Sequence, residues 1–325
     1  MKNVLVSGAS GIVGYGILRS LRMAKMNLKL VGTTIYEDSV AQGFCDVFER
    51  ALPTKDPEYM NWLSHILDKH QIDIIIPGIE DDLYKWVDFK SEIENRGTLV
   101  LANNPDLVAL CKDKWQFYLK MKEINSPFVI DSSVEPNFEL LADTFKLPFL
   151  LKPKRGFGSR GIVRIDNKEV FNKHKEDIGP ILLAQPIVGN PEEEFTTSAF
   201  CDGQGGFYAK MTMRRKLSKD GYTDRAETYK LERIDETLND LCRYFKPDGP
   251  TNFQFRRHGG LLKLLEINPR ISSSTSIRSA FGYNESAMAI NYYLENKIPV
   301  QPEIRKGKAV RYTEDFIFYE DRNHL

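Results

Sequence analysis

The sequence of residues 252–270, NFQFRRHGGLLKLLEINPR, decides how the chain folds. Two strand-like runs on either side of Gly259-Gly260 predict an antiparallel hairpin. Side chains alternate between the two faces of a strand, so Glu266 and Asn268 project together, about 7 Å apart along it. Two oxygen ligands at that spacing suit a hard cation. The hairpin therefore predicts a metal site.

Residues that pair across a hairpin point to the same face of the sheet. Gln254 therefore joins Glu266 and Asn268 only if it pairs with an even-numbered residue, so that the numbers of the paired residues have an even sum. A two-residue Gly-Gly turn forbids that sum, whereas a three-residue turn with a glycine bulge permits it. We therefore expect a three-residue turn, with Gln254 opposite Leu264 and diagonal to Glu266. One carboxylate and two amides leave positions open for water and ATP phosphates, which is how Mg²⁺ is usually held, and Mn²⁺ suits the same oxygen ligands. Arg270, just beyond Asn268, would place a bidentate donor beside a phosphoryl group in transit.

A second group of residues, upstream of the hairpin, suits a polyphosphate. Lys152 ends a strand-like run and leads into KRGFGSRG, a loop rich in glycine and basic residues. The backbone amides of Gly156, Gly158 and Ser159 can close over phosphate oxygens. A solvated hairpin is the simpler alternative and stays open at this point.

The first hundred residues alternate between strand and helix patterns. Strands are expected at Val4–Ser7, Leu28–Thr34, Asp73–Ile76 and Thr98–Leu101, and an amphipathic helix is expected from Tyr59 to beyond Leu67. This pattern predicts a parallel sheet with crossover helices, which binds ligands at the carboxyl ends of its strands. Gly8, Ser10 and Gly11 follow the first of these strands, and Glu80 follows the third.

The rest of the chain has a different texture. Helices are expected at Pro105–Cys111 and Asp113–Ile124, then near residues 235–246 and 284–296. Strands are expected at Phe149–Pro153, Gly161–Ile165, Ile181–Gln185, Glu194–Cys201, Phe207–Met213, Asn252–Arg257 and Leu261–Asn268. The predicted fold class is α/β plus α+β, with a parallel amino-terminal domain over residues 1–104 followed by mostly antiparallel sheets over residues 105–325.

The glycines after the first strand also fit a dinucleotide site. Such a site needs an acidic residue about 20 residues further on, at the end of the second strand, and here Glu37 and Asp38 arrive late. Tyr118 and Lys122 have the Tyr-x-x-x-Lys spacing of short-chain dehydrogenases, but two common residues coincide often at helical spacing. An NAD(P)-dependent dehydrogenase is therefore the most distant alternative, and a tight strand-to-helix turn is the simpler interpretation.

Composition narrows the class of partner. Among 325 residues, 45 basic and 45 acidic residues cancel, which disfavours nucleic acid and membrane surfaces and favours small-molecule substrates. The four cysteines form no Cys-x-x-Cys pair and no compact cluster with the histidines, which disfavours disulfides and structural zinc. No apolar run approaches the roughly 20 residues of a membrane span. We expect a reduced, cytoplasmic location.

The order of these motifs resembles the ATP-grasp superfamily, and within it the large subunit of carbamoyl phosphate synthase and its single-module relatives. The most specific match is NFQF followed by LLEINPR. The resemblance implies a pre-ATP-grasp, Rossmann-like domain over residues 1–104 and a two-lobed ATP-grasp domain over residues 105–325. The first lobe would end at about residue 182, and the second would begin at about 183.

The resemblance also implies roles for individual residues. Lys114 and Lys152 would contact ATP phosphates, the segment Gln185, Pro186, Ile187 and Val188 would meet the adenine, and Glu194 would meet the ribose. Gln254, Glu266 and Asn268 would bind magnesium, while Arg270 and Lys152 would act on the transferred phosphoryl group. Family members often carry Glu where this chain has Gln185, so the hydrogen bonds to adenine are left open.

The implied reaction is phosphoryl transfer from ATP to a carboxylate, giving an acyl phosphate that an amine, or a related nucleophile, attacks. For the substrates, Gly8, Ser10 and Gly11 would shape the acceptor pocket, Glu80 would bind the amine or cap the next helix, and Arg214 or Arg225 would bind the carboxylate. The second ATP-grasp half of the synthase has no counterpart in these residues, so a subunit of a split synthase-like enzyme is the second alternative. A homo-oligomer is possible.

Overall fold

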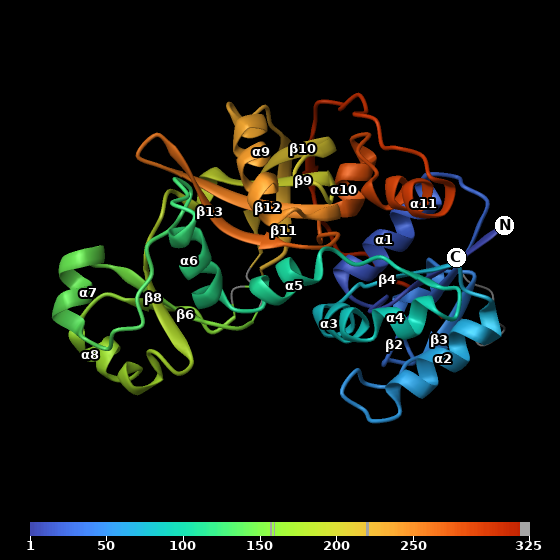
Figure 1. Cartoon of the computed structure of the whole chain (residues 1–325), viewed down its shortest axis with the longest axis horizontal. Coiled ribbons are helices and arrows are strands. Elements are labelled where there is room, and N and C mark those ends of the chain that lie inside the picture. Colours follow the sequence, from blue (N-terminus) through green and yellow to red (C-terminus); the bar gives the residue numbers. More distant parts are fainter. Residues whose placement is uncertain (157, 159, 219–220, 319–325) are drawn as a thin grey trace.

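The structure, a computed structural model, describes residues 1–318 except 157, 159, 219 and 220. Figure 1 shows the small sheet (β6, β8) at one end of the long axis, the large antiparallel sheet in the middle and the parallel sheet at the other end. These sheets have three, six and five strands respectively. The architecture confirms the predicted fold class of a parallel unit followed by antiparallel sheets.

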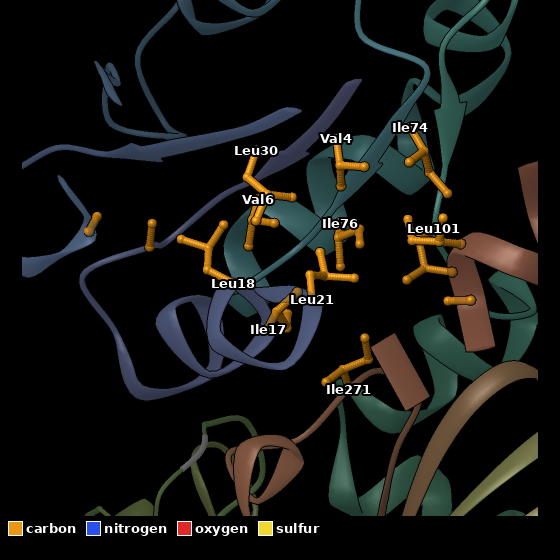
Figure 2. Packing of buried hydrophobic residues seen from close by; sticks show 14 of the residues in the cluster. Val4, Val6, Ile17, Leu18, Leu21, Leu30, Ile74, Ile76, Leu101 and Ile271 are labelled. Carbon is orange, nitrogen blue, oxygen red and sulfur yellow. The ribbon is translucent and has the colours of Figure 1, made fainter. Parts of the chain in front are cut away.

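The parallel sheet has the strand order β3-β2-β1-β4-β5. Its strands are β1 (Lys2–Val6), β2 (Leu28–Thr34), β3 (Val47–Arg50), β4 (Ile74–Ile76) and β5 (Leu99–Val100); the helical elements among them are α1 (Ile12–Met23), η1 (Val40–Gly43), α2 (Tyr59–His70), α3 (Glu80–Asp88) and α4 (Lys90–Glu94). The central strands are buried on both faces, which is why they are almost wholly apolar. On one face, Val4, Ile76 and Ile17 form the core beneath α1, and Figure 2 shows Ile271 pointing into the same cluster.

The glycine-rich turn after β1 serves close packing between two crossover connections. A Cβ on Gly14 would lie 2.3 Å from the Gly8 carbonyl oxygen, and a Cβ on Gly78 would lie 2.1 Å from the Ser7 oxygen and 2.8 Å from the Cα of Gly14. No side chain larger than hydrogen fits at these positions. The tight strand-to-helix turn therefore accounts for these glycines without a bound nucleotide.

Helices α5 (Pro105–Cys111) and α6 (Lys114–Glu123) lead from the parallel unit to the small antiparallel sheet, whose order is β7-β6-β8. Its elements are α7 (Phe138–Phe145), β6 (Phe149–Pro153), β7 (Val163–Ile165), α8 (Lys168–Asn172), η2 (Lys175–Asp177) and β8 (Leu182–Pro186). Because β8 pairs with β6 over its whole length, the expected lobe boundary at about residue 182 falls at the start of a strand of this sheet. We propose that the small lobe extends to Pro186.

The large sheet is antiparallel throughout, in the order β13-β12-β9-β10-β11-β14. Its strands are β9 (Glu194–Asp202), β10 (Phe207–Leu217), β11 (Thr223–Thr228), β12 (Asp248–His258), β13 (Leu261–Asn268) and β14 (Lys308–Val310); η3 (Pro191–Glu193), α9 (Ile234–Phe245), α10 (Thr275–Ala280) and α11 (Glu285–Glu295) accompany them. Phe195, Phe253 and Phe255 pack against α9 on one face. The opposite face carries polar residues of the cleft described below, such as Arg215 and Gln254, next to the buried Met211 and Met213.

The hairpin of β12 and β13 differs from the expectation in one respect. His258 pairs with Leu261, so the turn has two residues, Gly259 and Gly260, both with positive φ. The predicted three-residue turn is wrong, and Gln254 lies opposite Glu266 instead of Leu264. A β-bulge has the effect that was expected of the turn. It shifts the register by one residue between Gln254 and Phe255, so Gln254 pairs with an even-numbered residue.

A shared core joins the parallel unit to the large sheet. Ile271, Phe200 and Ile290 from the second half of the chain pack in the same cluster as α1. Asn284 Nδ2 donates to the Ser20 carbonyl at 2.7 Å, and Asn103 Nδ2 donates to Thr251 Oγ1 at 2.7 Å. The two units are therefore held by both apolar and polar contacts. Among the described residues, no helix is long and apolar enough to cross a membrane.

Candidate active site

A cleft of about 500 Å³ lies between the three sheets. Its lining includes Lys114, Lys152, Gly156, Gly158, Gln185, Glu194, Gln254, Glu266, Asn268, Arg270 and Glu80. Most of the residues predicted for a nucleotide and a metal thus meet in one place. Ser159 lies outside the described residues.

The three expected metal ligands lie together at the edge of the large sheet. Asn268 Nδ2 donates to Glu266 Oε1 at 2.9 Å, which places both side chains on one face as the alternation predicts. Gln254 is the cross-strand partner of Glu266, and its Oε1 accepts a hydrogen bond from Arg215 at 2.6 Å. Because the Asn268 amide donates through nitrogen, its oxygen is the atom that suits a cation. The Glu266 carboxylate and the Asn268 amide oxygen fit Mg²⁺ or Mn²⁺, and the Gln254 oxygen could join them only through the lone pair that Arg215 does not use.

Glu194 has partners that the sequence did not predict. Its Oε1 accepts from Arg215 at 2.9 Å, and its Oε2 accepts from Arg256 at 2.7 Å. Glu194 and Arg215 are almost completely buried, so this carboxylate is a counter-ion that two guanidinium groups share. Glu194 also lines the cleft, and its expected contact with the ribose stays a prediction.

Arg215 and Arg256 are the functional residues that sequence reasoning missed. The alternation of side chains along β10 and β12 could have identified both residues. Met211 and Met213 are buried on β10, so the next residue on the same face is Arg215. Arg256 stands two residues after Gln254 on β12 and therefore shares its face.

Lys152 lies at the end of β6 and points into the cleft beside other charged groups. Burial and the positive charges of Arg256 and Lys114 lower its pKa to about 8, although Glu266 and Glu194 act in the opposite direction. A lysine in this state is still mostly protonated at neutral pH. It therefore offers a poorly solvated ammonium group that gains stability when an anion arrives.

Lys114 opens α6 and holds the basic loop. Its Nζ donates to the Gly156 carbonyl at 2.8 Å, and its backbone N–H donates to the Lys154 carbonyl at 2.8 Å. Asp113 caps the same helix through Trp115 N–H at 2.9 Å and pairs with Arg155 at 3.3 Å. The loop after β6 is thus fixed to the start of α6, with Gly156 and Gly158 facing the cleft.

The expected adenine segment begins at the end of β8 and continues past it. Gln185 lines the cleft and donates from Nε2 to Ser132 Oγ at 2.8 Å. Pro186, Ile187 and Val188 are outside the set of described residues that line the cleft, and Val188 is buried. The structure therefore brings Gln185 to the site and leaves the next three residues beside it.

Arg270 meets Glu80 across the boundary between the two halves of the chain. Its Nη2 donates to Glu80 Oε1, and its Nη1 donates to the Ile271 carbonyl at 2.9 Å. Burial disfavours the charge of Arg270, but the Glu80 carboxylate outweighs that effect and the pKa of the guanidinium is raised. Glu80 is also the first residue of α3, where a negative charge stabilises the helix N-terminus.

The expected carboxylate-binding arginines lie on the wrong face. Arg214 is exposed on β10 and pairs with Glu227 of β11, while its neighbour Arg215 faces the cleft. Arg225 is the cross-strand partner of Lys216, which alternation places on the same outer face as Arg214. Both predictions are wrong by one residue of strand register.

The amino-terminal glycine turn lies outside this cleft in the described part of the chain. Ser10 Oγ is hydrogen-bonded to Thr34 Oγ1 at 2.8 Å, and Gly11 N–H donates to the Gly8 carbonyl at 2.8 Å. Gly8 has positive φ and packs against Ile79. These contacts explain the turn by packing, and an acceptor role for Gly8, Ser10 and Gly11 stays a prediction.

The cleft combines three kinds of chemical group. Hard oxygen ligands stand on β12 and β13, a poorly solvated ammonium group stands on β6, and a buried guanidinium stands just beyond β13. Within the described residues, no group of three His, Cys, Asp or Glu side chains forms a metal site. The arrangement suits a polyphosphate that brings its own share of ligands to a divalent cation.

Comparison with known proteins gives similarities in sequence and in fold. Residues 182–316 match the family described as "ATP-grasp in the biosynthetic pathway with Ter operon". A curated relative, the carbamoyl phosphate synthase large chain, C-terminal section, of Methanocaldococcus jannaschii, is 21% identical over 227 residues. That match covers 65% of this chain and 37% of the relative, so the chain spans well under half of that protein.

Solved structures resemble nearly the whole chain. The ADP complex of N5-carboxyaminoimidazole synthetase from Staphylococcus aureus has a TM-score of 0.74 at 16% identity and covers 93% of this chain and 80% of its own. Biotin carboxylase from Campylobacter jejuni, in a complex with β,γ-ATP, has a TM-score of 0.73 at 16% identity, with 93% and 73% covered. The biotin carboxylase domain of 2-oxoglutarate carboxylase from Hydrogenobacter thermophilus, with MgADP and bicarbonate, has a TM-score of 0.71 at 17% identity, with 94% and 73% covered.

Proposed function

This chain has the ATP-grasp fold, and from that premise we propose that it is an ADP-forming ligase that joins a small carboxylate to an amine through an acyl phosphate. The observation that supports this most is the convergence of the Glu266–Asn268 pair, the opposite Gln254, Lys152 and Arg270 in one cleft. A module that only binds MgATP does not require a buried arginine beside the metal-ligand set. The proposed substrates are small molecules, and the proposed location is the cytoplasm.

The proposed reaction has two transfers. A carboxylate oxygen attacks the γ-phosphorus and ADP leaves; the amine nitrogen then attacks the acyl carbon, loses a proton, and inorganic phosphate leaves. A divalent cation on Gln254, Glu266 and Asn268 would neutralise phosphate charge. Lys152 and Arg270 hold the transferred group in line, and no protein nucleophile is required.

Water must be kept from the acyl phosphate between the two transfers. A role for the loop after β6 in this task is supported by Lys114, which holds the Gly156 carbonyl, and by Gly156 and Gly158, which line the cleft. Exclusion of water by this loop protects the intermediate and strengthens the surrounding charge interactions. We propose this role for residues 154–161 in addition to phosphate binding.

The comparisons guide the choice of substrates. The matched family's description names a biosynthetic pathway, which fits a ligase that builds a small molecule. The Methanocaldococcus relative is part of a carbamoyl phosphate synthase, which favours bicarbonate as the acceptor in the second candidate function. In that function the chain would be one subunit of a split synthase-like enzyme.

Hydroxylamine trapping separates these candidates. The purified chain is incubated with MgATP, hydroxylamine and a panel of amino acids, sugar acids and other carboxylates, and both ADP release and hydroxamate formation are measured. The proposed ligase gives carboxylate-dependent ADP and the matching hydroxamate, whereas ADP release with bicarbonate alone supports the second candidate. Glu266→Gln should abolish either activity, and Glu92→Gln, a charge removed from the exposed surface of α4, should preserve it. Absence of MgATP binding by calorimetry would reject both.

A further inference from the structure

Glu80 belongs to the parallel unit and lines the cleft beside Arg270, where the transferred phosphoryl group is proposed to lie. Among the described acidic residues of that unit, Glu80 is the one that forms an ion pair with Arg270. It begins α3, and Arg270 follows β13, 190 residues later in the chain. Their side chains are 16% and 13% exposed, so the pair is largely removed from water. A buried guanidinium without a counter-ion is costly, which makes the identity of this counter-ion important.

Two carboxylates and a phenol surround the guanidinium. Glu80 is in direct contact with Arg270, and Glu266 and Tyr84 also act on it electrostatically. Burial and the neighbouring Glu80 carboxylate raise the pKa of Tyr84 to about 12, so it stays uncharged at neutral pH. In the proposed function, a bound cation takes up the charge of Glu266, and Glu80 is then the remaining counter-ion of Arg270.

Both partners stand on fixed supports. Ile271, next to Arg270, is 2% exposed in the core beneath α1, and Figure 2 shows it beside Ile17. On the other side, the buried Asp82 accepts from Thr54 Oγ1 at 2.6 Å and from Tyr59 at 2.9 Å, which fixes the first turn of α3. The pair therefore joins two rigid elements across a shared core.

We propose that Glu80 is the positioning residue for Arg270 in phosphoryl transfer. The parallel unit thereby supplies part of the phosphoryl-transfer machinery, in addition to any acceptor pocket. Glu80 holds one nitrogen of the guanidinium and the Ile271 carbonyl holds another, which leaves the remaining N–H groups for the transferred group in this proposal. This inference rests on the proposed function. It replaces the expectation that Glu80 binds the amine, because its carboxylate is already occupied by Arg270.

The test measures the affinity of the full chain for MgADP with and without fluoroaluminate, which mimics the phosphoryl group in transit. A transition-state mimic binds more tightly than MgADP alone when the site is complete. In Glu80→Gln we expect MgADP affinity within about twofold of wild type, while the added affinity from fluoroaluminate falls by about 10- to 100-fold. Arg270→Met should lose the same increment, and the double variant should lose no more than Arg270→Met alone.

The controls distinguish positioning from general destabilisation. Glu80→Asp should recover part of the fluoroaluminate increment, and Glu92→Gln should keep all of it. A Glu80→Gln variant that binds MgADP–fluoroaluminate as tightly as wild type, or whose losses add to those of Arg270→Met, overturns the inference and leaves the proposed function intact. A wild-type chain that binds no MgADP overturns the proposed function and the inference together. If Glu80→Gln does not fold, the comparison is made between Glu80→Asp and Arg270→Lys.

Discussion

The lowered pKa of Lys152 makes nucleotide affinity depend on pH in a defined direction. Lys152 is charged below its pKa of about 8, and burial with the charges of Arg256 and Lys114 is what lowers that value. Phosphate oxygens favour the charged form, so the protonated side chain is the one that binds MgATP. Rising pH removes the proton and therefore weakens binding.

The size of the effect follows from the fraction of Lys152 that is protonated. This fraction is roughly 0.9 at one pH unit below the pKa and roughly 0.1 at one unit above it, so the apparent Kd should rise by about ninefold between pH 7 and 9. Each further pH unit should cost about another tenfold. Tyr84, with a pKa of about 12, does not titrate in this window.

Isothermal calorimetry of MgATP binding in buffers of different ionisation enthalpy measures both the Kd and the proton uptake. Lys152→Arg is the matched control, because guanidinium stays charged throughout and the slope should vanish. A Kd that does not change between pH 7 and 9 in wild type, with no proton uptake, would refute the reasoning. An equal slope in Lys152→Arg would do the same, since another group would then be responsible.

Three further predictions concern residues on either side of the cleft. Arg215→Met should weaken MgATP binding by about tenfold or more, because Glu194 and Gln254 lose a charged partner. Arg214→Met removes the same charge from the outer face and should change the affinity by less than about twofold. Equal losses of affinity in calorimetry would contradict the assignment of faces. Gly78→Ala should cost more than about 4 kcal/mol in urea unfolding, since its Cβ would lie 2.1 Å from the Ser7 carbonyl oxygen, and a stable, soluble variant would show that this turn is less tight than described. Glu285→Gln breaks a fully buried pair with Arg278 and should cost about 3–5 kcal/mol, against less than about 0.5 kcal/mol for Glu94→Gln in the surface pair with Lys90, both measured by urea unfolding.

Local sequence patterns predicted most of the long elements. Leu28–Thr34, Phe149–Pro153 and Leu261–Asn268 are strands at the expected bounds, because each is long and rich in apolar residues. The expectation missed β11, which lies inside the large sheet, and also β3 and β14, which are short strands at sheet edges. Such strands bury one side only, and their sequences carry little pattern.

The positions of site residues could be predicted where they depend only on the alternation of side chains along one strand. Glu266 and Asn268 project together as expected. The pairing of Gln254 was not predictable, because a bulge at its neighbour shifts the register without any signal in the turn. Contacts between distant segments were equally hidden. Nothing in the sequence near Glu80 indicates that its partner is Arg270.

The carboxyl-terminal segment links the large sheet to the parallel unit. β14 pairs with β11 at the edge of the large sheet, and further along the chain Phe316 covers Gly43 of η1 in the parallel unit. Together with the shared core beneath α1, this strap resists sliding between those two bodies. In the proposed function, a hinge motion of the small lobe would then admit the nucleotide and release the product, so substitutions in the segments before β6 and after β8 should alter turnover.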